Sequence, residues 1–215
     1  GSVIHSLDMF VDSDLKIVNE VLIPIDHCLL SNSSLSEINT VYSKDQAIGQ
    51  CRDWLRRNLP HATLVHASST ADAVDKAKTE NGVAVIASAL ASEQYGVNIV
   101  ERGIQDKADN TTRFLVIGRD PAPAPSDPGT CKTSILITIN HEPGALQKAL
   151  KPFGTRDINL SRIESRPSRK KAWDYVFFID LTGHWNEKHI QDAIGELKQC
   201  CPLLKWLGSY PNAVS

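Results

Sequence analysis

The run Asp109 to Ile117 places a hydroxyl group beside a guanidinium group. Thr112 precedes Arg113, and Phe114 opens a short apolar stretch. An arginine can hold a carboxylate with two parallel N–H donors, and a threonine hydroxyl can donate a hydrogen bond. This pair could hold a small carboxylic acid and offer it a proton donor. An exposed arginine beside a threonine at the start of a strand is the ordinary alternative, so further sites must support the chemistry.

Hydroxyl side chains also stand where helices are expected to begin after strands. Ser69 and Thr70 open one such helix, and Ser88 opens the next. Free backbone N–H groups and the helix dipole favour anions at these points, although capping alone is commoner. Two such helix starts after neighbouring strands could converge on one cleft at the carboxyl ends of the strands. A small dianion would fit there.

Two runs in the C-terminal part could line another pocket. The run Gly144-Ala145-Leu146 lies at a predicted strand-to-helix turn, where glycine permits a tight bend. Asn159 and the run Glu164-Ser165-Arg166-Pro167 flank the next predicted strand. Taken alone, these runs indicate only a βα turn and a strand that ends in a polar hairpin.

A proline-rich segment divides the chain. Residues 119–130 hold four prolines, which prevent a helix and favour extended geometry. We therefore predict a first domain over residues 1–118, a linker over 119–130 and a second domain over 131–215.

The elements predicted on either side of the linker differ in kind. The first domain alternates strands at 15–25, 62–65, 83–87 and 114–117 with helices at 44–59 and 71–78, which predicts an α/β fold with a parallel or mixed sheet. The apolar runs 83–87 and 114–117 are typical of strands buried on both faces. The second domain reads β-α-β-β-α-β, with strands at 133–140, 158–164, 173–181 and 203–208 and helices at 144–153 and 186–200. That order predicts a ferredoxin-like sandwich.

Composition narrows the possible partners. The 215 residues have a net charge of −2, which gives no reason to expect nucleic acid or an anionic membrane. No apolar run approaches the ~20 residues of a membrane span. The five cysteines are irregularly spaced, as in a cytoplasmic protein with reduced thiols. The seven histidines lack ligand spacing, so we expect no metal site.

Taken together, these runs resemble the prephenate dehydratases with a C-terminal ACT regulatory domain. The resemblance covers essentially the whole chain, in blocks at 1–8, 17–24, 42–51, 69–71, 84–88, 110–114 and in the second domain. It implies conversion of prephenate to phenylpyruvate, with loss of water and carbon dioxide and no cofactor. It also implies a catalytic region of two lobes like those of periplasmic binding proteins, and an ACT domain that binds phenylalanine at a dimer interface and inhibits the enzyme.

The resemblance assigns roles to the candidate residues. Thr112 would sit against the departing hydroxyl group, Arg113 would anchor a substrate carboxylate or organise the site, and Phe114 would form its floor. Four hydroxyl residues would supply further substrate contacts: Ser2, Ser69, Thr70 and Ser88. The phenylalanine pocket would comprise Gly144, Ala145, Leu146, Asn159, Glu164, Ser165, Arg166 and Pro167.

Departures from the family pattern leave alternatives open. The usual Gly-Thr-Phe block is absent, so we expect most of the first catalytic lobe to be missing and this chain alone to be weak or inactive. Lys44 and Asp45 stand where His-Pro is usual, and Gln147 replaces an apolar residue. The alternatives are arogenate dehydratase, and a non-catalytic phenylalanine sensor. We expect a cytoplasmic homodimer or homotetramer.

Overall fold

A computed structural model describes residues 4–107, 110–124, 127–167 and 175–213. By internal contacts the chain forms two compact units. One, which we call the terminal unit, comprises Gly1–Leu22 and Arg113–Ser215, and the other, the central unit, comprises Ile23–Thr112. These boundaries differ from the division predicted at the linker, because the first residues of the chain belong with the C-terminal half.

The central unit is built on a five-stranded mixed sheet. Its strands have the order β4-β3-β5-β2-β6. Their bounds are β2 Cys28–Leu30, β3 Thr40–Ser43, β4 Thr63–His66, β5 Val83–Ala87 and β6 Ile99–Glu101. Strand β3 runs parallel to β4 and β5, whereas β2 is antiparallel to β5 and β6. The predicted α/β fold with a mixed sheet is confirmed for this region.

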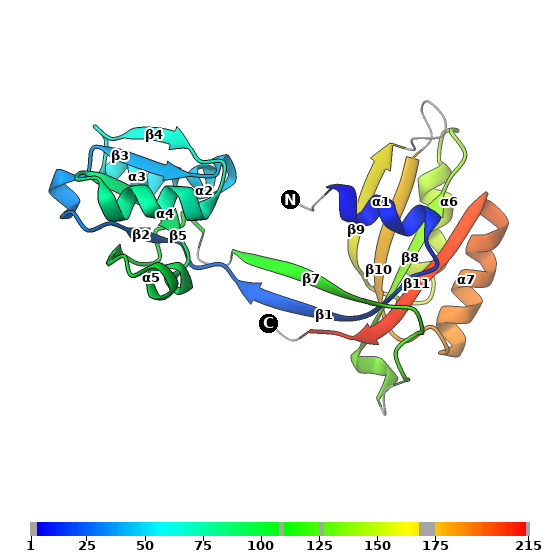
Figure 1. Ribbon diagram of the computed structural model, residues 1–215. Coiled ribbons are helices and arrows are strands. Elements are labelled where there is room, and N and C mark those ends of the chain that lie inside the picture. Colours follow the sequence, from blue (N-terminus) through cyan, green and yellow to red (C-terminus); the bar gives the residue numbers. More distant parts are fainter. Residues whose placement is uncertain (1–3, 108–109, 125–126, 168–174, 214–215) are drawn as a thin grey trace. The chain divides into compact units, whose positions relative to one another are not determined.

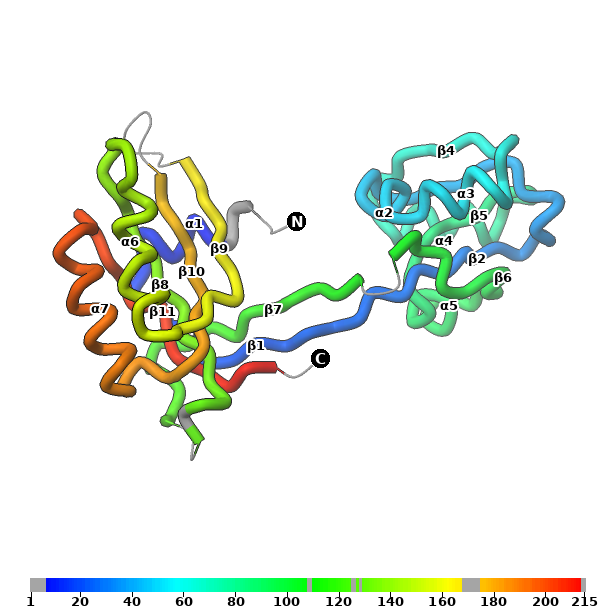
Figure 2. Tube along the Cα trace, turned by 180° about the vertical axis from the view of Figure 1, so that it is seen from behind, coloured from blue at the N-terminus to red at the C-terminus, as the bar shows by residue number. Residues whose placement is uncertain are grey.

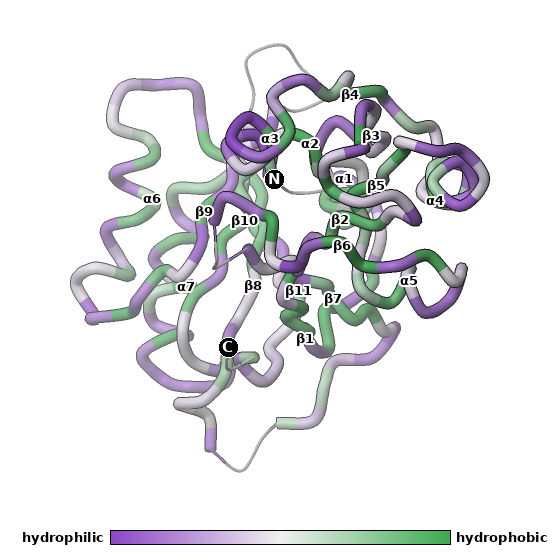
Figure 3. Tube along the Cα trace, turned by 90° about the vertical axis from the view of Figure 1, so that its left-hand side faces the viewer, coloured by the Kyte–Doolittle hydropathy of each residue, from purple (hydrophilic) through white to green (hydrophobic). Residues whose placement is uncertain are grey.

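Helices cover both faces of this sheet. The helices are α2 Asp45–Gln50, α3 Arg52–Asn58, α4 Thr70–Thr79 and α5 Ala89–Tyr95, and a short 3-10 helix, η1, spans Leu35–Glu37. Alternate residues of β5 enter two separate cores, one with α4 and α5 and one with α2 and α3. All five residues of β5 are buried, as predicted, and Figure 3 shows this strand and β2 in the colour of hydrophobic residues.

The helix predicted over residues 44–59 is interrupted at Cys51. There the backbone leaves helical geometry, with φ −116° and ψ 14°. The carboxylate of Asp106 accepts hydrogen bonds from the backbone N–H groups of Asp53 and Trp54, both at 3.1 Å. Asp106 thus caps the second helix and gives it a separate N-terminus. The same contact fixes the loop that carries Gln105 and Asp106.

The terminal unit contains a four-stranded antiparallel sheet in the order β11-β8-β10-β9. Its elements are β8 Cys131–Thr138, α6 Ala145–Gly154, β9 Leu160–Pro167, β10 Tyr175–Thr182, α7 Lys188–Cys200 and β11 Leu203–Pro211. Helices α6 and α7 cover one face, where Ile137 and Ile179 of the sheet meet Ile194 and Leu197 of α7 (Figure 1). The predicted β-α-β-β-α-β order and ferredoxin-like fold are confirmed. Residues 119–124 of the linker have no regular structure, and the 3-10 helix η2, Pro128–Thr130, leads into β8.

The opposite face of this sheet is covered by the start of the chain, which the sequence did not predict. Helix α1, Ile4–Asp12, and strand β1, Lys16–Pro24, lie there (Figure 2). Leu7, Phe10 and Ile17 pack against a core that includes Phe178 and Leu207. The ammonium group of Lys205 donates to the carbonyl oxygen of Phe10 at 2.9 Å and to that of Ser13. These bonds satisfy carbonyl groups at the C-terminal end of α1.

Strand β1 also pairs with β7, Thr111–Gly118, in a separate two-stranded sheet. The prediction that residues 114–117 are buried on both faces is wrong. Phe114, Val116 and Ile117 are 51%, 41% and 48% exposed, and only Leu115 packs against the core beside α1. The physical reason is that β7 has a single strand neighbour in the described part of the chain, so most of its apolar side chains stay uncovered.

Gly208 allows β11 to pass close to β1. Its φ is +148°, and a Cβ there would lie 2.1 Å from the carbonyl oxygen of Ile17. We expect Gly208→Ala to lower the free energy of unfolding by at least ~1–3 kcal/mol, because the backbones must separate. Urea titration measures this. Gly195→Ala is the matched control, since Gly195 lies inside α7 with nothing near its Cβ position. Equal stability of the two variants would contradict the prediction.

Candidate functional site

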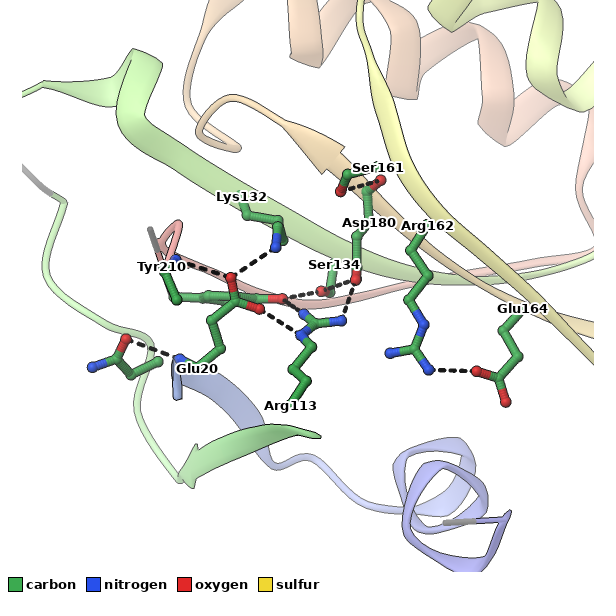
Figure 4. A network of polar contacts seen from close by, with 11 residues as sticks. Glu20, Arg113, Lys132, Ser134, Ser161, Arg162, Glu164, Asp180 and Tyr210 are labelled. Atoms are coloured by element: carbon green, nitrogen blue, oxygen red, sulfur yellow. Dashed lines mark hydrogen bonds and ion pairs between the residues drawn. The ribbon is translucent and has the colours of Figure 1, made fainter. Parts of the chain in front are cut away.

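Arg113 lies in a polar network inside the terminal unit (Figure 4). Each of its three side-chain nitrogens donates to another side chain. Nε donates to Glu20 at 2.5 Å, one terminal nitrogen to Asp180 at 2.5 Å, and the other to the Tyr210 hydroxyl at 2.7 Å. Strands β1, β10 and β11 supply these partners. The geometry therefore favours the organising role expected for Arg113 over direct binding of a substrate carboxylate.

Glu20 joins a second cation to this network. Its side chain is fully buried and also accepts from Lys132 at 2.7 Å and from the backbone N–H of Ala213 at 3.0 Å. Burial opposes ionisation of Glu20, but Lys132, Ala213 and Arg113 outweigh it and hold the pKa of Glu20 below its ordinary value. Asp180 contributes the second negative charge, so two carboxylates balance two cations.

Ser134 and Tyr210 complete the network. The Ser134 hydroxyl donates to Asp180 and shares a hydrogen bond of 2.6 Å with the Tyr210 hydroxyl. Burial, with Asp180 nearby, raises the pKa of Tyr210 well above its ordinary value. Tyr210 therefore stays neutral and can donate. Each side-chain nitrogen of Arg113 thus has a hydrogen-bond partner, and these bonds hold the guanidinium group in one arrangement.

Thr112 and Phe114, the neighbours of Arg113, are oriented differently. Thr112 is half-buried and Phe114 is exposed. The residue before Thr112 lines a cavity of about 490 Å³ in the central unit. The cavity is lined by Gly49, Gln50, Gln105, Asp106, Lys107, Asn110 and Thr111. Thr112 itself is not among these lining residues. We take the cavity, with the adjacent Thr112, as the candidate catalytic site.

The cavity is rich in side-chain amides, which the sequence did not single out as candidates. Gln50 bonds to the His27 ring at 2.8 Å, and Gln105 accepts from the His27 backbone N–H at 2.9 Å. The Nδ2 atom of Asn110 is buried with no hydrogen-bond partner among the described residues. An unsatisfied buried donor costs about 1–3 kcal/mol, so this amide has a donor to offer to an ordered water or to a ligand. The nearness of Asn110 and Gln105 to Thr112 in sequence was the available signal.

The hydroxyl residues predicted at helix starts do not line this cavity. Ser69 caps α4, accepting from the Asp72 N–H at 3.1 Å, while Thr70 is the first residue of α4. Ser88 occupies the N-cap position of α5, and its side chain makes no capping bond. The sequence analysis expected the preceding strands, β4 and β5, to be neighbours in the sheet. In the structure β3 lies between them. Ser2 lies outside the described residues.

A second cavity, of about 200 Å³, lies at one end of the terminal unit's sheet. Its lining comprises Ile139, Asn140, His141, Glu142, Gly144, Ala145, Leu146, Gln147 and Tyr175. The structure thus brings Gly144, Ala145 and Leu146 together around one pocket. Gly144 is the N-cap of α6 with φ +78°, a backbone geometry that glycine adopts readily.

The other predicted pocket residues are distributed around β9. Ser165 lies opposite Phe177 of β10, whose side chain enters the core beneath α6 and α7, whereas Glu164 lies opposite Phe178 on the α1 face. Ser165 and Pro167 therefore share the face of the cavity, and Glu164 pairs with Arg166 on the other face.

Asn159 precedes β9 at the opposite end of the strand. There its carbonyl oxygen accepts from the Thr182 N–H at 2.9 Å. Within one chain, Asn159 and the run that ends at Pro167 are thus separated by the length of β9.

The described part of the chain holds no cluster of metal-ligating side chains, and two of its cysteines have raised pKa values. No group of three or more His, Cys, Asp or Glu side chains there could hold a metal ion. Burial raises the pKa of Cys51 to about 12 and that of Cys201 to about 11, so neither forms a reactive thiolate at neutral pH. Across the same residues, no helix is both long and apolar enough to cross a bilayer.

Comparison with known proteins matches the two parts of the chain to two family models. Residues 1–122 match the prephenate dehydratase model, and residues 133–199 match the ACT domain model. A bifunctional chorismate mutase/prephenate dehydratase from Aquifex aeolicus is 49% identical over the whole chain, which spans 59% of that protein.

Monofunctional relatives agree with this match. A prephenate dehydratase from Mycobacteroides abscessus is 34% identical, and the chain covers 70% of its length. A crystal structure of prephenate dehydratase from Arthrobacter aurescens in complex with L-Phe is 34% identical and superposes with a TM-score of 0.85 over 100% of this chain and 74% of that one. The chain therefore belongs to the prephenate dehydratase family and carries that family's catalytic region, in part, ahead of an ACT domain.

Proposed function

We propose that the protein containing this chain converts prephenate to phenylpyruvate and is inhibited by L-phenylalanine through its ACT domain. The observation that carries the proposal is the family match across residues 1–122 with the Thr112-Arg113-Phe114 run intact. The amide-lined cavity beside this run supports it. Prephenate carries two carboxylates and one hydroxyl group, and side-chain amides can donate hydrogen bonds to all of them.

The reaction requires little covalent chemistry from the protein. The ring carboxylate leaves as carbon dioxide, its bonding electrons enter the ring, and the ring hydroxyl departs as water after gaining a proton. We assign the Thr112 hydroxyl to donate toward that departing oxygen. Threonine is a weak acid, so orientation of the substrate and fixed dipoles must supply much of the acceleration. The Asn110 amide, whose Nδ2 atom has no partner among the described residues, is a suitable donor.

The cavity of about 200 Å³ in the terminal unit, which we call the ACT cavity, suits a small amino acid. The N-terminus of α6 offers free N–H groups for a carboxylate, while Leu146 and Tyr175 offer apolar surface for a benzyl side chain. The complex of the Arthrobacter aurescens protein with L-Phe supports this assignment.

A dimer formed along β9 would complete this pocket. Strand β9 is an edge strand, and Ile163 at its middle is 45% exposed. An edge strand presents unpaired backbone groups to a second strand. Antiparallel pairing of two copies about Ile163 would bring Asn159 of one copy near Pro167 of the other. We therefore propose a homodimer as the effector-binding form.

Steady-state assays of the whole protein test the function. Phenylpyruvate formation from prephenate, with kcat/KM well above that for the arogenate reaction, is the expected result. A clear preference for arogenate would identify an arogenate dehydratase instead. Turnover of neither substrate, with L-phenylalanine still bound in calorimetry, would identify an amino-acid sensor.

Gly144→Ala is expected to weaken L-phenylalanine binding. A Cβ at φ +78° is strained by about 1–2 kcal/mol, and relief of that strain moves the turn that lines the pocket. The expected rise in Kd is about 5- to 30-fold by calorimetry. Gly154→Ala in the same helix is the control, because its φ is not positive and nothing lies near its Cβ position. Equal Kd values for the two variants would show that the turn at Gly144 does not contribute to L-phenylalanine binding.

A further inference from the structure

A row of charged side chains crosses the face of the ACT sheet that α1 covers. On β9, Arg162, Glu164 and Arg166 alternate along one face, and Glu164 pairs with both arginines. Across the sheet, Arg162 is the register partner of Asp180 on β10. Asp180 in turn accepts from Arg113. Figure 4 shows Arg162 and Glu164 beside the network around Arg113.

One end of the row, Arg166, lies on the face of the sheet opposite the ACT cavity, and the other end is Arg113. At one end, Arg166 precedes Pro167, which is the register partner of Tyr175, and Tyr175 lines the ACT cavity. At the other end, Arg113 is joined by a peptide bond to Thr112. Asp180 and Tyr210 thus contact the residue that directly follows the proposed proton donor.

Because these charged side chains are largely buried, moving one of them away from its partner would cost much free energy. The side chains of Glu20 and Asp180 are 0% and 9% exposed, and those of Arg113 and Arg166 are 18% and 14% exposed. A buried charge that loses its partner is strongly destabilised, so such networks adopt discrete arrangements. Arg166 Nε is buried without a partner among the described residues, so the row has an unsatisfied donor at its Arg166 end.

We propose that Asp180 and Tyr210 are positioning residues for the dehydration, which hold the backbone of Thr112 in place through Arg113. This inference rests on the proposed function only for its kinetic readout. No substrate contact is assigned to Asp180 or Tyr210.

Two conservative variants test the proposal in the whole protein. Asp180→Asn keeps the shape of the side chain and removes its charge, and Tyr210→Phe removes a single oxygen atom. We expect each to lower kcat for prephenate by about 10- to 100-fold, the scale of a small misplacement, with KM within about 2-fold.

The control is Glu196→Gln, which removes an ion pair with Arg156 in the same unit, away from the network. It should leave kcat unchanged. Wild-type kcat in both Asp180→Asn and Tyr210→Phe would overturn the proposal. So would a rise in KM that accounts for the whole loss, because that pattern belongs to a substrate ligand. A double-mutant cycle of Arg113→Gln with Asp180→Asn should be non-additive, since both act through one contact.

Hydrogen exchange separates this inference from the proposed function. In Asp180→Asn, the backbone amides of residues 111–115 should exchange faster than in the wild type or in Glu196→Gln, with no change in global stability large enough to explain it. Faster exchange in a protein that does not turn over prephenate would retain the positioning role and reject the proposed reaction. Unchanged exchange and unchanged kcat in an active enzyme would reject the positioning role alone.

Discussion

Replacing Thr112 by alanine is expected to lower kcat for prephenate by about 10²–10⁴-fold, the range typical of a lost proton donor. The physical reason is that the departing hydroxyl group would have no donor at its position. Thr112→Ser keeps the hydroxyl and should retain most of the activity. The measurement is steady-state turnover by the whole protein, with circular dichroism to show that each variant is folded.

Thr79→Ala is the matched control for this experiment. Thr79 is the exposed last residue of α4, and its hydroxyl donates only to the carbonyl oxygen of Asp75 at 2.8 Å. It should leave turnover unchanged. If Thr112→Ala kept more than a small part of wild-type turnover, the donor would have to be another group, and the amides of Gln50, Gln105 and Asn110 would be the next to examine.

Glu20→Ala is expected to lower the free energy of unfolding by about 3–5 kcal/mol, the scale for breaking a buried ion pair by removing one partner. It leaves Arg113 and Lys132 without the carboxylate that both contact. Glu20→Gln, which keeps the volume, should lose less. Urea unfolding measures both, and removal of the exposed Glu196 carboxylate should have little effect by comparison.

The Glu20 contribution should also depend on pH in a definite direction. Its pKa in the folded state lies below the ordinary value of 4.5. The carboxylate therefore stabilises the fold fully above pH 4.5, and that stabilisation is lost as pH falls through the folded-state pKa. The stability difference between wild type and Glu20→Gln should be constant near neutral pH and shrink in acid. A difference that grows in acid would contradict the assigned ion pairs.

Local sequence patterns predicted the helices and strands more reliably than the contacts that those helices and strands make with distant parts of the chain. The ACT order of strands and helices and the buried strand Val83–Ala87 followed from periodicity, because each pattern reflects one face meeting one core. The break at Cys51 did not, because it depends on Asp106, which lies 53 residues from the helix residue it caps. The exposure of Phe114 also escaped prediction, since apolar content alone does not reveal how many strands pair.

The site shows the same limit. Gly144, Ala145 and Leu146 line one cavity because they are adjacent in sequence at a single turn. The partners of Arg113 lie 93, 67 and 97 residues away, so no local pattern could distinguish a substrate anchor from a buried network. The split of Glu164 and Ser165 between two faces follows from strand alternation, and could have been expected once that run was assigned to a strand.

The packing of α1 against the ACT sheet limits how the ACT domain could be transplanted. A segment excised at the proline-rich linker would leave behind Leu7, Phe10 and Ile17, and with them the cover of one whole sheet face. Grafted onto another enzyme, it would expose Phe178 and Leu207 to water unless the host supplied a replacement helix. Transfer of the ACT domain to another enzyme would therefore require the residues of α1 and the start of β1 to move together with the sheet they cover.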